Sequence, residues 1–488
     1  MPEHDDVLDG AVAPPAAFSS TPVLLTASPL QRIGAFALAD KAGVASPGEV
    51  TSEALVAVVA GMTDDLLRTS DLAKASDPGG FWLSASYLLW PNSKINPSSR
   101  GRLSPAERRA RIEDWRSGDT ASRRLGVPCA YCGREACDWF GKVDMPLGAS
   151  VEHRNTTAPG QQGTPLCFPC VACLWAFPYG ARLAGGRATA VHSWDDSFLA
   201  WSVQSAVRRT QQDAAVSAAQ KDAKPGPYER ELSVLRAVRG YGHRITAPVE
   251  LIVLSNSNKE QLLITQELSE PIAVWLRSTV RRSESAKGYP VLVATQAARQ
   301  VPGEAFLAKR LFSRPGQVLV RAVTHLLERM AAAGGAISLE VVSLGPILHS
   351  YCEEVLNMDE KDVERIRSLA GRLASVLGRD SRPGPLRGFI RANSRGGNLH
   401  GWFRTKAVEW QLMRRRPEGS TPPLLPVHDY RLLFEDERSW AWRRLLTFAV
   451  LEALAEAGWK PEGSEEELNE FSSEVADSAA HDSDTNEG

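Results

Sequence analysis

Six of the seven cysteines lie within 45 residues of one another, and four of them form two C-x-x-C pairs. The first pair is PCAYC, with Cys129 and Cys132, and the second is LCFPC, with Cys167 and Cys170. Each pair can occupy two corners of a tetrahedral Zn²⁺ site, and four thiolates close such a site to other ligands. The spacing therefore predicts a structural zinc site with Cys129, Cys132, Cys167 and Cys170 as ligands.

The ligand set has alternatives. The remaining two clustered cysteines are Cys137 and Cys173, and the run CFPCVAC allows Cys173 to replace an assigned ligand. Four cysteines also hold iron–sulfur clusters, but nothing else in the chain indicates redox chemistry, so zinc is favoured. A buried thiol without a metal behaves as a small apolar side chain. This is the interpretation we prefer for Cys137, Cys173 and Cys352.

An enzymatic alternative follows from the 34 residues between the two pairs. HNH-type nucleases hold a structural zinc with two C-x-x-C pairs and place a catalytic histidine between them. The segment VEHRN supplies Glu152 and His153 there. His153 would activate a water molecule and Glu152 would help to bind a catalytic metal. Cys173 and apolar residues stand where a further histidine usually follows the second pair, so an HNH-like zinc-containing DNA endonuclease is the second interpretation.

The composition is that of an ordinary globular protein. The chain has 488 residues, of which 43% are apolar and 23% charged, and this excludes a wholly disordered, collagen-like or coiled-coil chain. No run approaches the ~18 apolar residues of a membrane helix, and the acidic start does not resemble a signal peptide. We therefore expect a cytoplasmic protein of roughly two to four domains that does not bind membranes.

Charge is distributed unevenly along the chain. Residues 1–20 hold four acidic side chains and residues 461–488 hold ten, and neither segment contains Lys or Arg. The body between these tails has 56 basic residues against 44 acidic ones. A basic body indicates a polyanionic partner.

The densest basic stretch is 379–416, where ten basic and two acidic residues alternate with glycines and aromatic residues. Arginine can follow a phosphate backbone and aromatic rings can stack on bases, so we expect nucleic-acid contact. The alternative is a solvated loop, with Trp402 and Phe403 anchoring a helix in the core. A second basic segment runs from Lys94 to Arg124. From the two segments we assign to nucleic acid Lys94, Arg100, Arg382, Arg387, Arg391, Arg395, Lys406, Arg414, Arg415 and Arg416.

Hydrophobic periodicity predicts the elements that must position these residues. Ser104, Pro105 and Glu107 predict a capped helix start. Helices are expected from Pro29 and over 50–68, 104–117, 195–223, 315–334, 358–378, 400–416 and 437–458, and strands over 249–258 and 290–295. The fold class is α+β. A zinc-containing α+β domain over 26–300, with its zinc module at about 125–195, precedes a mainly helical domain over 301–460. Segments 1–25 and 461–488 are expected to be disordered.

Four segments together resemble a known family. GTPLCFPCVACLWAFPYG followed by HSWDDSFL is similar to the CRISPR-associated CXXC–CXXC proteins, and so are PLQRIGAFALADKAGV and SYLLWPNSKINPSS. Those proteins are large subunits of type I (I-B-like) Cascade complexes. The resemblance covers roughly residues 29–200.

The resemblance implies an antiviral-defence scaffold that is not itself an enzyme, with structural Zn²⁺ at the two cysteine pairs. Guide RNA pairing would read the target sequence, while this subunit reads a short flanking motif in the duplex. Its partners would be the other Cascade subunits, the CRISPR guide RNA, target double-stranded DNA with its displaced strand, and a helicase-nuclease. The loop with Asn92, Lys94 and Asn96 would touch the flanking motif.

Overall fold

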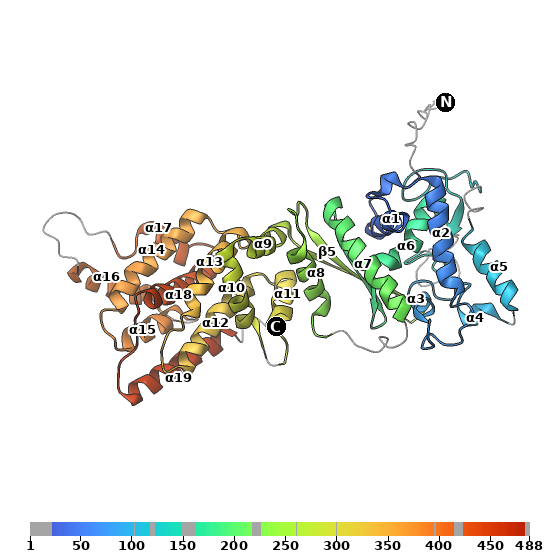
Figure 1. Ribbon diagram of the computed structural model, residues 1–488. Helices are drawn as coiled ribbons and strands as arrows, with labels where there is room; N and C mark the ends of the chain where they lie inside the picture. The colour runs from blue at the N-terminus through green and yellow to red at the C-terminus, as the bar shows by residue number, and fades with distance from the viewer. Residues whose placement is uncertain are drawn as a thin grey trace, which may run out of the picture. The chain divides into compact units, whose positions relative to one another are not determined.

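The computed structural model describes residues 22–101, 103–117, 123–148, 163–216, 226–259, 261–298, 300–394, 397–413 and 423–483. The fold is mixed α+β, with many helices and small sheets (Figure 1). This confirms the predicted class. Most of the segment 1–25 lies outside the described residues, so its expected disorder stays a prediction.

The chain forms two compact units, each built from several segments. Unit 1 comprises Met1–His192, Leu199–Ala223 and Val253–Ile264, and unit 2 comprises Ser193–Phe198, Lys224–Ile252 and Thr265–Gly488. Residues 301–460 lie within unit 2. Their independence as a helical domain, with a boundary near residue 300, stays a prediction.

The N-terminal helices begin where the sequence places their caps. The Thr51 hydroxyl accepts from the backbone N–H of Ala54, and Ser104 and Glu107 form the predicted capping box. Up to residue 216 the elements are α1 (Pro29–Ala42), η1 (Pro47–Glu49), α2 (Ser52–Leu67), α3 (Phe81–Leu89), α4 (Pro97–Arg100), α5 (Pro105–Trp115), β1 (Asp138–Phe140), β2 (Thr164–Leu166), α6 (Phe168–Ala176), η3 (Phe177–Gly180), β3 (Arg182–Ala184), β4 (Arg187–Ser193) and α7 (Asp196–Val216).

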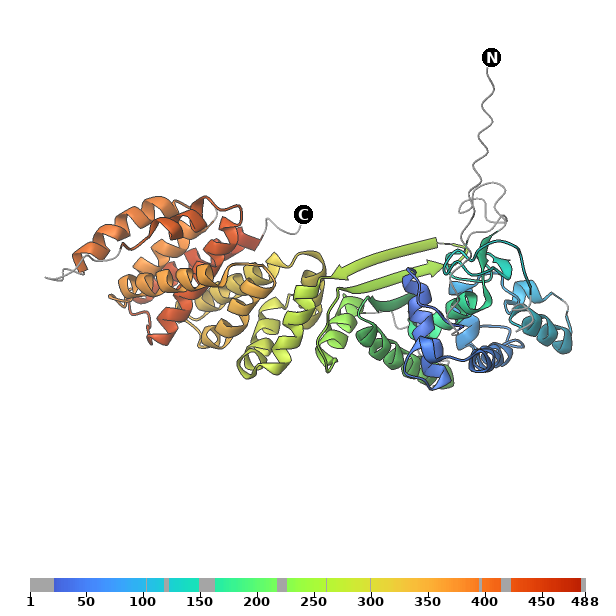
Figure 2. The same cartoon turned by 90° about the horizontal axis from the view of Figure 1, so that it is seen from above.

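Two sheets are present in the described chain. Strands β1 and β2 pair antiparallel, with Asp138 opposite Leu166 and Phe140 opposite Thr164. The second sheet has the order β3-β4-β5-β6, with β5 (Val249–Asn256) and β6 (Gln261–Leu268) as neighbours (Figure 2). Seven of the eight β5 residues are buried, which agrees with the apolar run that predicted this strand.

The remaining elements of the described residues are helices. They are α8 (Glu229–Gly240), α9 (Glu270–Arg281), α10 (Ser283–Gln296), α11 (Gly303–Ser313), α12 (Gly316–Ala332), α13 (Glu340–Glu354), α14 (Glu360–Leu377), α15 (Gly384–Asn393), α16 (Leu399–Met413), α17 (Val427–Phe434), α18 (Ser439–Glu456) and α19 (Glu465–Ser483). None of the described helices combines the length and apolarity needed to cross a lipid bilayer.

Two expectations for this region are wrong. Residues 290–295 belong to helix α10 and not to a strand, because a short apolar run fits a buried helix as well as a strand. The tail 461–488, expected to be disordered, contains α19. Phe471 and Val475 of α19 are buried, with the Phe471 ring against Gly335, and this apolar contact stabilises an otherwise acidic helix.

Candidate metal centre

The first cysteine pair sits at the tip of a tight backbone turn. The N–H of Ala136 donates to the carbonyl of Val127 at 2.9 Å, and the N–H of Gly133 donates to the carbonyl of Cys129 at 3.0 Å. Gly133 has a φ of 74°, a left-handed conformation that glycine adopts without steric cost. The reversal directs Cys129 and Cys132 to the same side of the turn.

The second pair lies at the start of a helix. Cys167 is the N-cap residue of α6, with extended backbone angles, and Cys170 follows in the first helical turn. The proline at the start of the helix is suited to a position where a backbone N–H has no helical partner. Exposed N–H groups at a helix start carry partial positive charge, which favours thiolate sulfurs there.

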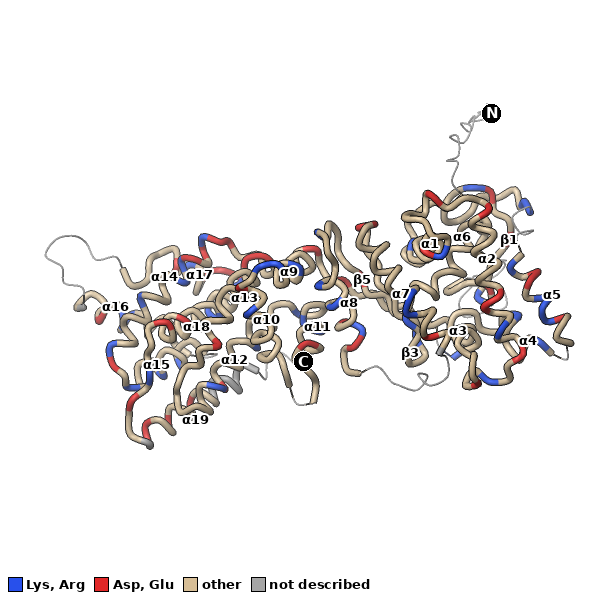
Figure 3. Tube along the Cα trace, in the orientation of Figure 1, with Lys and Arg blue, Asp and Glu red and all other residues tan. Residues whose placement is uncertain are grey.

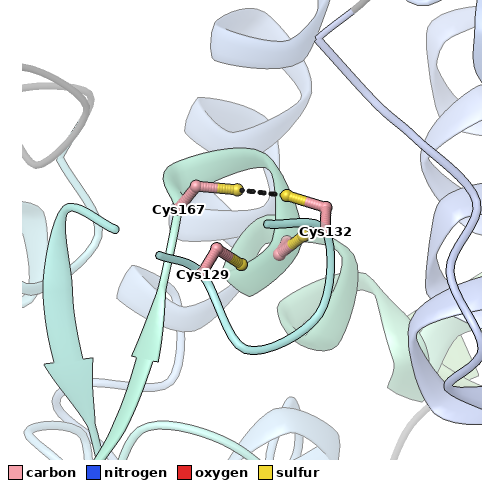
Figure 4. Close-up of side chains that lie close together, drawn as sticks. Cys129, Cys132 and Cys167 are labelled. Carbon is pink, nitrogen blue, oxygen red and sulfur yellow. Dashed lines mark hydrogen bonds between the residues drawn. The ribbon is translucent and has the colours of Figure 1, made fainter. Parts of the chain in front are cut away.

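Strands β1 and β2 bring the two pairs together. The N–H of Ala130 donates to the carbonyl of Pro165 and that of Cys137 to the carbonyl of Leu166, each at 2.9 Å. As a result, the four Sγ atoms lie within 4.8 Å of one another. They belong to Cys129, Cys132, Cys167 and Cys170. Figure 4 shows the sulfurs converging, with Cys132 and Cys167 Sγ 3.5 Å apart.

The arrangement fits a tetrahedral metal. Four thiolates at ~2.3 Å from zinc have their sulfurs about 3.8 Å apart, which agrees with the observed separations. In the described part of the chain these four cysteines are the group of His, Cys, Asp or Glu residues close enough to hold a metal. The predicted ligand set therefore converges, and it is consistent with zinc.

The four clustered thiols strongly shift one another's pKa values. Hydrogen bonds from the other three cysteines lower the pKa of Cys129, and the same sharing of protons raises the pKa of Cys167 and Cys170. Ionising every thiol together would place four negative charges within a few ångströms. A bound divalent cation offsets that repulsion.

The other three cysteines lie apart from this cluster. Cys137 Sγ donates to the carbonyl of Leu166 at 3.2 Å, and burial raises its pKa to about 11. Burial likewise raises the pKa of Cys173 to about 12. Cys352 is buried in α13. All three are buried and lie outside the four-cysteine group, which agrees with their interpretation as small apolar side chains.

Helix α1 covers the cysteine module directly. The backbone of Gly34 lies so close to α6 that a Cβ at residue 34 would overlap the carbonyl of Cys173. Next to this contact, the buried Gln31 donates from Nε2 to the carbonyl of Leu24 at 2.7 Å and to Cys173 Sγ at 3.5 Å. The cysteine pairs therefore anchor α6, and α6 in turn anchors α1.

A buried arginine that packs against Trp175 of α6 was not foreseen from the sequence. The Arg116 guanidinium lies over the rings of Trp90, Trp115 and Trp175, 4.6, 4.7 and 5.0 Å from their centroids. Burial lowers its pKa to about 9. Asp144 links two of these tryptophans. Its Oδ1 accepts from Trp115 Nε1 at 2.9 Å, and its backbone carbonyl accepts from Trp175 Nε1 at 3.0 Å.

The loop assigned to the flanking motif has an accessible part. Asn92 is exposed with a φ of 63°, and its Oδ1 accepts from Asn258 Nδ2 at 3.1 Å. Lys94 is half-buried. Both side chains can therefore be reached from solvent.

The assignment of Asn96 and Arg100 to nucleic acid is corrected by their burial. Asn96 Nδ2 donates to the Ser86 hydroxyl at 2.8 Å, and the side chain is fully buried. Arg100 donates from Nη2 to the carbonyl of Leu72 at 2.7 Å and is also buried. Their polar groups hydrogen-bond the loop to Ser86 and Leu72. The basic character of the segment gave no indication of this structural role.

In the basic stretch 379–416, several described side chains pair with acids. Arg382 pairs with Asp380 at 2.6 Å, Lys406 with Glu409 at 2.8 Å, and Arg387 with Glu470 of α19 at 3.1 Å. Figure 3 shows basic and acidic residues interspersed along the helices of this region, α15, α16 and α19. Arg391 is exposed. Phe403 is buried, as the alternative interpretation expected, whereas Trp402 is only half-buried. Glu152, His153, Arg395, Arg414, Arg415 and Arg416 lie outside the described residues.

Comparisons with known proteins give no relative: no protein-family model matches the chain, and neither does any curated protein or solved structure.

Proposed function

We propose that this chain is a nucleic-acid-binding scaffold similar to the large subunit of a type I Cascade complex, with zinc in a structural role. The observation that carries the proposal is the packing within unit 1. Two of the segments that resemble the CXXC–CXXC proteins, 29–44 and 163–180, are far apart in the sequence and pack against each other through α1 and α6, the helix that carries Cys170 of the cluster.

Contacts between these segments support a rigid base for the flanking-motif loop. Gly34 places α1 against α6. The buried Asn256 donates from Nδ2 to the carbonyls of Leu89, Lys142 and Met145 at 2.8, 3.1 and 3.3 Å. Leu89 directly precedes the loop, and Lys142 and Met145 follow β1 of the cysteine module. Such a base fixes the loop so that exposed side chains keep one geometry.

The exposed loop residues have suitable chemistry for a short DNA motif. An asparagine amide offers both a donor and an acceptor to a base edge, and a lysine ammonium can reach a base acceptor or a phosphate. In the proposal, Asn92 and Lys94 contact the duplex beside the guide-paired target. The basic stretch 379–416 contacts the guide–target duplex or the displaced strand through residues left unpaired by neighbouring acids.

The cysteine cluster supports a structural role for the metal. Four thiolates fill the coordination sphere of a tetrahedral metal, so such a site has no position for water or substrate. In the proposal the reaction on DNA belongs to a helicase-nuclease that docks on the assembled complex, and the remaining partners are the other Cascade subunits and the guide RNA.

The test is to sequence the nucleic acid that co-purifies with the tagged protein from its own host at low salt. RNAs of uniform length, each with one variable stretch beside a constant repeat, support the proposal. Heterogeneous DNA, or a clean protein free of nucleic acid, contradicts it.

A cleavage assay on duplex DNA distinguishes the HNH nuclease from the proposed scaffold. If the chain is a nuclease, Mg²⁺-dependent cleavage occurs and His153→Ala abolishes it. If it is a scaffold, the purified chain and the His153→Ala variant are equally inactive on DNA.

A further inference from the structure

Unit 2 contains a cavity of about 590 Å³ lined by residues of α10, α13, α14 and α18. Carboxylates outnumber basic groups on its walls. The charged groups that line it are Glu284, Lys287, Glu353, Arg367, Glu452 and Glu456. Arg367 also pairs with Glu364 at 2.9 Å, which further reduces the positive charge available to the cavity.

Two polar side chains in the wall are buried close together, and one of them has an atom without a hydrogen-bond partner. His349 of α13 is 9% exposed, and its Nε2 has no hydrogen-bond partner among the described residues. That nitrogen lies 3.4 Å from Oε2 of Glu452 on α18, which is 7% exposed. Gly345 lets the Glu452 carboxylate approach the α13 backbone closely. Buried polar atoms are normally hydrogen-bonded, so the unpartnered Nε2 of His349 indicates room for a further polar partner in the cavity.

The wall offers hydrogen-bond acceptors. Burial, together with the charge of Arg367, lowers the pKa of His349 to about 4, so the imidazole is neutral near pH 7 and one ring nitrogen accepts. Pro346 has no N–H for the carbonyl of Val342, four residues earlier in α13, and both residues line the cavity. A ligand that matches this wall must donate hydrogen bonds.

A single metal ion does not match the geometry. Within the residues that the structure describes, the cavity carboxylates and His349 are not among the groups close enough to share one ion. Negative charge spread over a volume of this size instead suits a ligand whose positive groups are separated by a flexible chain.

We propose that this cavity binds an aliphatic polyamine, with one ammonium group on Glu452 and His349 and another on the remaining lining carboxylates, Glu284, Glu353 and Glu456. The site is separate from the nucleic-acid surfaces proposed above, and it goes beyond that function.

Binding should depend on pH in a defined direction. Burial raises the pKa of Glu452 to about 7, and Glu456 adds to the rise while Arg367 opposes it. The groups facing the pair are Glu284 and Lys287 from α10, Glu353 from α13, Arg367 from α14 and Glu456 from α18. An ammonium ion attracts the ionised form of Glu452, so affinity should rise as pH increases from 6 to 8.

The experiment is calorimetric titration of the full chain, freed of nucleic acid, with spermidine at pH 6, 7 and 8. We expect saturable binding that is at least about threefold tighter at pH 8 than at pH 6. Glu452→Gln should weaken binding at pH 8 about tenfold or more and remove most of the pH dependence. Glu437→Gln is the matched control, because Glu437 is exposed and does not line the cavity.

A further variant distinguishes a specific site from general attraction to acidic surface. Lys287→Gln removes a positive group from the wall and should tighten spermidine binding, while the uncharged analogue 1,4-butanediol should not bind. Equal affinities for Glu452→Gln and Glu437→Gln, or the absence of saturable binding, would overturn the proposal. Circular dichroism of each variant checks that it is folded, and the proposal on nucleic acid is unaffected by either outcome.

Discussion

At the scale of single residues, the four clustered cysteines combine burial with ionisable chemistry. Their sulfurs lie within 4.8 Å of one another, and a metal is what allows four such groups to be charged together. A structural zinc site therefore contributes directly to the free energy of folding.

The corresponding prediction concerns Cys167→Ser. We expect loss of bound zinc and a free energy of unfolding lowered by several kcal/mol, because three thiolates hold zinc less tightly and α6 loses its anchor. Elemental analysis and thermal melting measure the two effects. Cys137→Ser is the control, since Cys137 lies outside the cluster, and it should keep full zinc content. A Cys167→Ser chain with normal zinc and an unchanged melting temperature would contradict a structural site.

A second prediction at this scale concerns pH and stability. The pKa of Glu452 rises from its ordinary value of 4.5 to about 7 on folding. The folded state therefore holds this proton more tightly than the unfolded state, and stability from this group is lost as pH rises from about 4.5 through 7. Glu452→Gln should thus stabilise the chain at pH 8, by on the order of 2 kcal/mol, and have little effect near pH 4.5. Urea unfolding at both pH values measures the difference, and equal effects at both would refute it.

At the scale of elements, α19 shows how apolar contacts organise an acidic segment. Phe471 is fully buried, and Arg387 of α15 pairs with Glu470 and, at 3.7 Å, with Glu474. Exposed ion pairs of this kind contribute little stability, so the apolar side chains hold the helix in place.

Replacing Phe471 with alanine should therefore destabilise unit 2 by about 3–5 kcal/mol, the usual cost of removing a buried aromatic ring. Chemical denaturation measures the loss. Glu470→Ala should cost less than about 1 kcal/mol. Comparable losses from both variants would show that charge and not packing retains α19.

Two variants in the flanking-motif loop distinguish a residue that recognises the DNA motif from a residue that stabilises the loop. Asn92→Ala should change the preferred flanking motif in a binding assay against a randomised duplex library, with the melting temperature nearly unchanged. Asn96→Ala should instead lower the melting temperature, because it leaves the buried Ser86 and Ser93 hydroxyls without the amide they contact. If Asn92→Ala binds more weakly but keeps the same motif preference, Asn92 contacts only the DNA backbone and does not read the motif.

Sequence reasoning succeeded where a local pattern determines the structure. The C-x-x-C pairs, the Ser104 capping box and the apolar run of β5 each depend on neighbouring residues. It failed for residues 290–295 and for α19, where contacts with distant helices decide the outcome. For the same reason the burial of Asn96 and Arg100 could not be predicted, since only the folded chain brings Ser86 and Leu72 to them.

At the scale of the whole molecule, the proposed function depends on a basic body that binds a polyanion. Each phosphate contact releases counterions, so affinity falls as salt rises. In the basic stretch, Arg382, Arg387 and Lys406 already pair with acids, so the sequence of this stretch overstates the charge that it offers.

The salt dependence of binding tests this directly. Replacing Arg414, Arg415 and Arg416 with alanine should weaken binding to all sequences alike and reduce the slope of log affinity against log salt by about one for each phosphate that is no longer neutralised. Arg382→Ala should change the slope less, because Asp380 already neutralises that side chain. A slope unchanged by the triple substitution would remove this segment from the binding surface.

The closeness of α1 and α6 also has a genetic consequence. Every codon for glycine tolerates any third base, whereas a change in either of the first two bases introduces a side chain or a stop. At residue 34 such a side chain would meet the Cys173 carbonyl. In a saturation-mutagenesis library, position 34 should therefore be as depleted of missense alleles as the four cysteine positions, although glycine itself performs no chemistry.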